Sequence, residues 1–149
     1  MSELALLFVH LVSTLLMVGI IWFVQVVHYP LMACIGPEHF RRYSQLHQSR
    51  TTLVVAGPML VEALSAICLF VWFPPLRLSP AFLAAGVLLG LIWVSTAWWQ
   101  VPLHQALAHG YDERRILRLV QTNWLRTLAW STRGVLIGGI FWSTLAGAA

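Results

Sequence analysis

The stretch NWLRTLAWSTRG, residues 123–134, places two arginines seven positions apart in a segment whose other residues are largely apolar. Seven residues turn an α-helix by about 700° and advance it by about 10 Å, so Arg126 and Arg133 share one helix face. A guanidinium in the hydrocarbon of a bilayer is costly unless it faces other protein groups. Other helices must therefore cover this face, and the stretch decides the fold.

The composition of the 149-residue chain is that of an integral membrane protein. Hydrophobic residues make up 59% of it and charged residues 9%, whereas soluble domains are about 25% charged. The net charge of +4 comes from arginines in two loops and at helix ends, which excludes nucleic acid as a partner. We expect one domain over residues 1–149, embedded in a lipid bilayer, with the bacterial inner membrane as its location.

Hydropathy predicts an all-α protein, a four-helix bundle in the membrane. The expected spans cover about residues 4–27, 51–73, 81–101 and 124–145, each long enough to cross a hydrocarbon core of about 30 Å. We expect the sequence HYP at 28–30 to close the first span and Pro102 to lie near the end of the third.

The sidedness follows from the two long connections, which carry most of the arginines. Residues 34–50 and 102–123 lie on the same side of a four-span protein, and the positive-inside rule makes that side cytoplasmic. Both termini are then non-cytoplasmic. Within these connections we predict amphipathic segments at about 37–50 and 112–123, with Asp112 as the N-cap of the second.

Two GxxxG pairs, Gly86–Gly90 and Gly134–Gly138, fall in the expected third and fourth spans. Small residues at this spacing let helix backbones approach closely. We therefore expect the third and fourth spans to pack together at these glycines, with a homodimer face as the alternative use of one pair.

Each expected span has one polar face, traced by polar residues three or four positions apart. The cost of polar groups in lipid predicts that these faces meet. Glu62 is the only acidic residue inside a span, at about the same depth as Arg133, so the two should form an ion pair. Buried ion pairs are often no more stabilising than apolar residues. The pair is therefore either structural or part of a catalytic pocket.

Three histidines from three different segments, His28, His47 and His104, lie near the expected cytoplasmic interface. Histidine is a common metal ligand and a proton carrier near neutral pH. Together with Glu62, these residues are candidates for an iron, copper or zinc site. The alternatives are acid–base groups or ordinary interface residues. The residues predicted to bind a substrate beside them are Gln25, Gln100, Asn123, Arg126 and Trp130, in a chain with eight tryptophans.

The sequence GIIWFVQVVHYPLM at 19–32, followed by EHFRRYSQLH at 38–47 and NWLRTLAW at 123–130, resembles the anthrone-oxygenase-like family of small four-span membrane proteins. Pro30 and the row Asn123, Arg126 and Trp130 carry this likeness. The resemblance implies an oxidoreductase that acts on an apolar polycyclic or lipid-like substrate without a tightly held cofactor.

A second stretch, FVHLVSTLLMVGIIWF at 8–23, resembles small four-span haem-binding proteins such as the membrane protoporphyrinogen oxidases. This resemblance implies that His10 is a haem ligand.

The sequence predicts a membrane-embedded oxidoreductase that acts on a lipophilic small molecule in a polar pocket between its helices. Its predicted catalytic residues are Glu62, Arg133 and His47. Two other classes stay open. One is a haem- or metal-binding membrane protein, and the other is a non-catalytic subunit of a larger membrane complex. The expected partners also include a second copy of the chain, as a homo-oligomer.

Overall fold

The computed structural model of the protein describes residues 2–148, which are almost entirely helical and include no strand. The predicted all-α class is confirmed. The elements in chain order are α1 (Glu3–Phe23), the π-helical turn η1 (Val24–His28), α2 (Tyr29–Met32), α3 (Pro37–Trp72), α4 (Pro74–Arg77), α5 (Pro80–Ser95), the π-helical turn η2 (Thr96–Gln100), α6 (Val101–Leu107) and α7 (Glu113–Ala148).

Three helices are long and apolar enough to cross a membrane: Glu3–Met32, Pro37–Trp72 and Pro80–Leu107. Their outward faces carry many exposed large apolar side chains, such as Leu53 and Trp98, as expected for surfaces that contact lipid. These helices are consistent with a membrane protein. The helix α7 is as long as α3, but Arg126 and Arg133 and its arginine-rich first turns lower its hydropathy.

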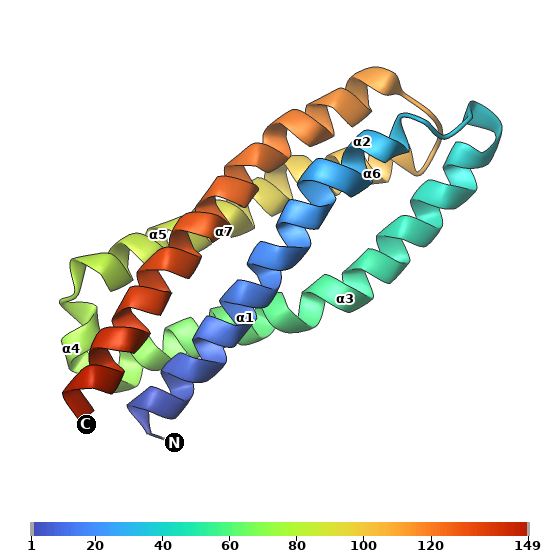
Figure 1. Cartoon of the computed structure of the whole chain (residues 1–149). Coiled ribbons are helices and arrows are strands. Elements are labelled where there is room, and N and C mark those ends of the chain that lie inside the picture. Colours follow the sequence, from blue (N-terminus) through green and yellow to red (C-terminus); the bar gives the residue numbers. More distant parts are fainter. Residues whose placement is uncertain (1, 149) are drawn as a thin grey trace.

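The helices surround a shared interior without closing around it. α1 packs against α3 and α7, and α7 packs against both α1 and α5, whereas α3 and α5 scarcely touch. The short helices α4 and α6 bridge α3 and α5 near their two ends. Figure 1 shows both termini and α4 at one end of the molecule, and the 33–36 and 108–112 connections at the other. We call the side between α3 and α5, where the two helix backbones make few contacts, the α3–α5 seam.

The expected helix ends at the two prolines are wrong, because a π-helical turn precedes each proline. In η1 the Tyr29 N–H donates to the Val24 carbonyl, and in η2 the Val101 N–H donates to the Thr96 carbonyl. Each of these five-residue steps accommodates one extra residue. The helix then continues past Pro30 to Met32 and past Pro102 to Leu107.

The predicted amphipathic segments are extensions of longer helices. Residues 37–50 are the first turns of α3, and residues 113–123 are the first turns of α7. Asp112 caps α7 as predicted, because its Oδ1 accepts a hydrogen bond from the Arg115 N–H at 3.1 Å.

The helices expected as the third and fourth spans do pack together, as α5 against α7, but the expected contact at their GxxxG glycines is wrong. A Cβ atom on Gly134 would lie 3.4 Å from Val18 Cγ2, and one on Gly138 would lie 4.0 Å from Leu11 Cδ1, so this pair faces α1. A Cβ atom on Gly86 or Gly90 would have no neighbour within 4 Å. The two glycines of α5 therefore face open space and make no close helix contact.

Candidate functional site

The predicted ion pair between Glu62 and Arg133 is confirmed, and both side chains are almost completely buried, at 0% and 1% exposed. Glu62 Oε1 accepts from Arg133 Nη2 at 2.9 Å, from Arg133 Nε at 3.1 Å and from Thr14 Oγ1 at 2.7 Å. Glu62 Oε2 accepts from Trp130 Nε1 at 3.0 Å. Both carboxylate oxygens are therefore occupied by protein donors.

The same network reaches all of the long helices. Arg133 on α7 also donates through Nη1 to the Ala85 carbonyl of α5, and its Nη2 lies 3.4 Å from His10 Nε2 on α1. His10 Nδ1 lies 2.8 Å from Ser65 Oγ on α3. Both ring nitrogens of His10 thus have protein partners. The catalytic role of Glu62 and Arg133 and the haem-ligand role of His10 stay predictions.

The predicted histidine cluster does assemble, near the end of the molecule where α2 and α6 lie. The ring centroids of His28 and His47 are 4.2 Å apart, and those of His47 and His104 are 5.2 Å apart. One nitrogen of each ring has a hydroxyl partner. His28 Nε2 pairs with Tyr43 at 3.2 Å, His104 Nε2 with Tyr29 at 2.9 Å, and His47 Nδ1 with Thr51 at 2.9 Å.

The geometry of this cluster does not support the predicted metal site. His28 and His47 stack face to face with 25° between their planes, so their nitrogens do not converge. The proposed fourth ligand, Glu62, is fifteen residues from His47 on the same helix, or about 22 Å along its axis. Within residues 2–148 no group of three or more His, Cys, Asp or Glu side chains is arranged to hold a metal ion.

Four of the five predicted substrate-binding residues form a chain of contacts, from Gln25 through Asn123 and Arg126 to Trp130. Gln25 Oε1 accepts from Asn123 Nδ2 at 2.8 Å, and Gln25 Nε2 donates to the Val120 carbonyl at 3.2 Å. Asn123 Oδ1 in turn accepts from Arg126 Nη1 at 3.3 Å. Gln25 and Asn123 therefore join η1 to α7 and support Arg126 from one side.

Arg126 is buried, at 7% exposed, without a carboxylate partner. Its guanidinium lies over the Trp130 ring at 5.2 Å from the centroid, a favourable cation–π distance. In the described part of the chain, no carboxylate lies within ion-pair distance of Arg126. The helix interior thus contains two guanidiniums, those of Arg126 and Arg133, and the single carboxylate of Glu62.

A cavity of about 240 Å³ lies between α3 and the η2–α6 segment. We call it the histidine cavity, and its polar walls are Tyr29, His47, Gln100, His104 and Arg126. Apolar side chains, including Met17 and Met59, line the part nearest the molecular centre, and Gln48 and Gln105 line the opposite part. The cavity therefore has a polar end and an apolar end.

Three buried polar atoms without a hydrogen-bond partner belong to residues that line this cavity. They are Gln100 Oε1, His104 Nδ1 and Arg126 Nε, and among the residues described only Ser95 Oγ shares this condition. A buried unpartnered polar atom costs about 1–3 kcal/mol. Three of these costs therefore fall on residues around one cavity.

The sequence predicted Gln100, His104 and Arg126 as site residues but missed Tyr29 and Gln48. Tyr29 lies in the HYP motif, which was interpreted as the end of a helix, so its place beside His104 was hidden. Gln48 lies in a segment expected to be amphipathic and solvent-facing, yet its Nε2 donates to the His104 carbonyl at 2.7 Å. The adjacency of Gln48 to His47 in a helix was the only available signal.

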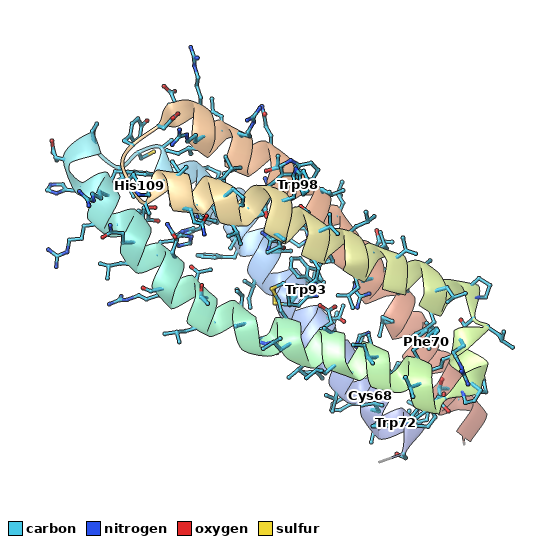
Figure 2. The ribbon with its side chains drawn as sticks, turned by 180° about the vertical axis from the view of Figure 1, so that it is seen from behind. Cys68, Phe70, Trp72, Trp93, Trp98 and His109 are labelled. Carbon is cyan, nitrogen blue, oxygen red and sulfur yellow. The ribbon has the colours of Figure 1, made fainter. Side chains whose placement is uncertain are left out.

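A second and larger cavity, of about 640 Å³, opens at the α3–α5 seam nearer the termini. We call it the α3–α5 cavity. Small and apolar residues line most of it, including Ala63, Gly86 and Gly90, and His10 and Arg133 lie at its polar side. In Figure 2, which shows the molecule from the α3 and α5 side, Trp93 lies between the two helices.

Comparison with known proteins gives this chain no relative. No family model, no curated protein and no solved structure matches it. The chemistry of the two cavities is therefore the basis for assigning a function.

Proposed function

We propose that the protein is a membrane-embedded oxidoreductase that binds a lipophilic aromatic molecule with phenolic oxygens in the histidine cavity. The observation that carries this proposal is the group of three unpartnered polar atoms on Gln100, His104 and Arg126 around one cavity. The guanidinium can donate a hydrogen bond to a ligand oxygen, and the amide oxygen and the imidazole nitrogen can accept one from a ligand hydroxyl. Together they suit a hydroxyl group or its ionised form. The resemblance to the anthrone-oxygenase-like family suggests the same substrate class.

The membrane arrangement that we propose has four spans, with both termini on the non-cytoplasmic side of the bacterial inner membrane. Two observations support it. α7 is 36 residues long and packs along both α1 and α5. Arg41 and Arg42 at the start of α3, and Arg114 and Arg115 at the start of α7, lie at the end of the molecule opposite the termini (Figure 1).

In this proposal His104 acts as the general base and Arg126 stabilises the oxyanion that forms. The buried His104 Nδ1 atom has no protein hydrogen-bond partner, and in this scheme it takes the phenolic proton once the ligand displaces the side chains that cover it. The Nε2 atom of the same ring is held by the Tyr29 hydroxyl at 2.9 Å. The Arg126 guanidinium faces the resulting phenolate, and a fixed positive group in a low-dielectric site stabilises such charge strongly. For a hydroquinone substrate and dioxygen as oxidant, the two electrons and two protons lost by the substrate leave as hydrogen peroxide.

We assign Glu62 and Arg133 a positioning role in this scheme. The Glu62 oxygens already accept from Thr14, Trp130 and Arg133, so they offer no free site to a substrate. Trp130 links this network to the histidine cavity, because its ring supports the Arg126 guanidinium.

The test uses the protein in lipid nanodiscs with a panel of lipophilic hydroquinones and polycyclic phenols. Binding is measured by ligand-induced thermal stabilisation, and turnover by oxygen consumption together with peroxide formation. We expect Arg126→Gln to weaken binding by about 10- to 100-fold, because a charged hydrogen bond of about 1.5–3 kcal/mol is lost. We expect His104→Gln to bind the phenol but to turn over at least about 100-fold more slowly.

The matched controls are Arg118→Gln and His109→Gln, which change exposed residues of the same types on α7 and just after α6. Both should behave as the wild type. If the wild type binds the phenol but consumes no oxygen, the protein binds this ligand and does not oxidise it. If binding and turnover fall equally in the cavity variants and in the controls, the histidine cavity is not the binding site.

A further inference from the structure

The histidine cavity and the α3–α5 cavity lie next to each other along the same seam. On α3, Met59 lines the first and Ala63 the second, one helical turn apart. On the facing helix, Thr96 lines the first and Trp93 the second. The two cavities share no lining residue, and the buried side chains of Met59 and Ile92 pack between them, so a molecule that reaches from one into the other passes this single turn of α3.

The polarity of the surroundings sets the direction of that extension. Gln48 and Gln105 line the histidine cavity on the side away from the seam's middle, whereas the side toward the α3–α5 cavity has Met17 and Met59. Beyond Met59 the lining is Ala63 and other small or apolar residues. The lining toward the α3–α5 cavity is therefore apolar. An apolar cavity of about 410 Å³ between α1 and α3 also adjoins the histidine cavity and shares Val24, His47 and Val55 with it.

The glycines of α5 give the α3–α5 cavity its width. Gly86 and Gly90 line it, and a Cβ atom at either position would meet nothing within 4 Å. Sequence reasoning expected these glycines to bring helices into close contact, and they do not. Their lack of side chains instead leaves room between α3 and α5.

We infer that the substrate carries a long apolar tail, which lies in the α3–α5 cavity while its phenolic head occupies the histidine cavity. This inference rests on the proposed function and narrows the substrate to a tailed hydroquinone, an amphiphile with one ionisable head. The Arg126 guanidinium, which has no carboxylate partner, fixes the head, because it donates to the phenolic oxygen and stabilises the phenolate that forms when His104 takes the proton. The seam lets the tail enter sideways from the bilayer.

The experiment compares two probes that share a dimethoxy-methyl-hydroquinone head, one with a decyl chain and one with a methyl group in its place. Apparent affinities are measured in nanodiscs of one lipid composition for wild type, Gly86→Leu, Gly90→Leu and the control Gly139→Leu. Gly139 lies on α7 outside both cavities, and its Cβ position is also open. Because partition of the decyl probe into lipid is the same for all variants, it cancels in the comparison.

We expect Gly86→Leu and Gly90→Leu to weaken the decyl probe by about tenfold relative to Gly139→Leu, because leucine fills the space of the tail. Affinity for the methyl probe should be unchanged. If the two leucine variants bind the decyl probe as tightly as Gly139→Leu does and still bind the methyl probe, the tail inference is wrong. The seam would then contact only membrane lipid. Failure of wild type to bind the methyl probe would instead overturn the proposed function.

A second measurement uses only the wild-type protein and so does not depend on how the leucine variants fold. The decyl probe carries a diazirine at the end of its chain, and the crosslinked residues are located by mass spectrometry. We expect labels in 63–70 of α3 and 83–93 of α5. Labels confined to outward lipid-facing residues such as Leu53 or Val135 would overturn the inference.

Discussion

Arg126 and Arg133 are the same type of residue and lie on the same face of α7, yet only Arg133 has an anionic partner. Arg133 binds Glu62 through two nitrogens, whereas Arg126 has an aromatic ring and one amide oxygen. Removing one member of a buried ion pair leaves an uncompensated charge, but removing both does not. The two arginines should therefore differ in what their replacement changes, stability for Arg133 and ligand binding for Arg126.

The Glu62–Arg133 pair gives a prediction about stability. We expect Glu62→Met and Arg133→Met each to lower the free energy of unfolding by about 3–5 kcal/mol, and the double variant to recover much of that loss. Thermal and denaturant unfolding in detergent, followed by circular dichroism, measures all four proteins. Additive losses in the double variant would show that the two side chains are not energetically coupled.

The sequence predicted this ion pair because lipid restricts the options. A lone acid and a deep arginine at one depth have few alternatives to each other. It could not predict Thr14 and Trp130 as further donors to Glu62, because both fit equally well as ordinary packing residues. The helix rise alone places Glu62 far from His47. The expected metal site that combined Glu62 with the histidines is therefore inconsistent with a single helix through both residues.

At the scale of the elements, the main departure from expectation is the pair of π-helical turns. The rule that proline ends a helix considers the lost N–H and the steric clash with the preceding turn. In η1 and η2 the bonding step widens by one residue just before the proline, and the helix continues. No local pattern in the sequence distinguishes such a turn from a helix end, since both place proline after an apolar run.

The turn η2 gives a prediction that separates the shape of the histidine cavity from the stability of the fold. Ala97 is an exposed residue of η2, and its deletion should convert the turn to a regular α-helix. Because a π-helical turn is the less favourable backbone form, we expect the helix content and the melting temperature to stay at wild-type values or rise. Gln100 and the wall of the histidine cavity should be displaced, so phenol binding should be lost. Retained binding with wild-type affinity would exclude η2 from shaping the site.

At the scale of the whole molecule, the sequence predicted the helices and their inward polar faces, but not the α3–α5 seam. Helical spacing shows which residues of one helix share a face and says nothing about which helices are neighbours. The seam exists because α3 and α5 are kept apart between α4 and α6. The residues that border it, Gly86 and Gly90, are of the type that ordinarily indicates the opposite, close packing.

The proposed topology gives a prediction about labelling. Cys34 is exposed in the connection between α2 and α3, so a membrane-impermeant maleimide should label it in inside-out vesicles and not in intact spheroplasts. In a background in which Cys34 and Cys68 are both replaced by serine, Gly147→Cys near the end of α7 should show the reverse. Labelling of both cysteines from the same side would mean that α7 does not cross the membrane.

The network around Glu62 also has a consequence for biosynthesis. Its participants are spread from Thr14 to Arg133, so the ribosome completes α1, α3 and α5 before the arginine that neutralises Glu62 emerges. Under the four-span topology, the translocon receives in α7 a segment that carries Arg126 and Arg133 and is therefore less favourable in lipid than the three earlier spans. The earlier helices then act as the template that draws it in. A nascent chain interrupted before residue 133 leaves Glu62 in the bilayer without its guanidinium partner, so its carboxyl group must be protonated or remain near water.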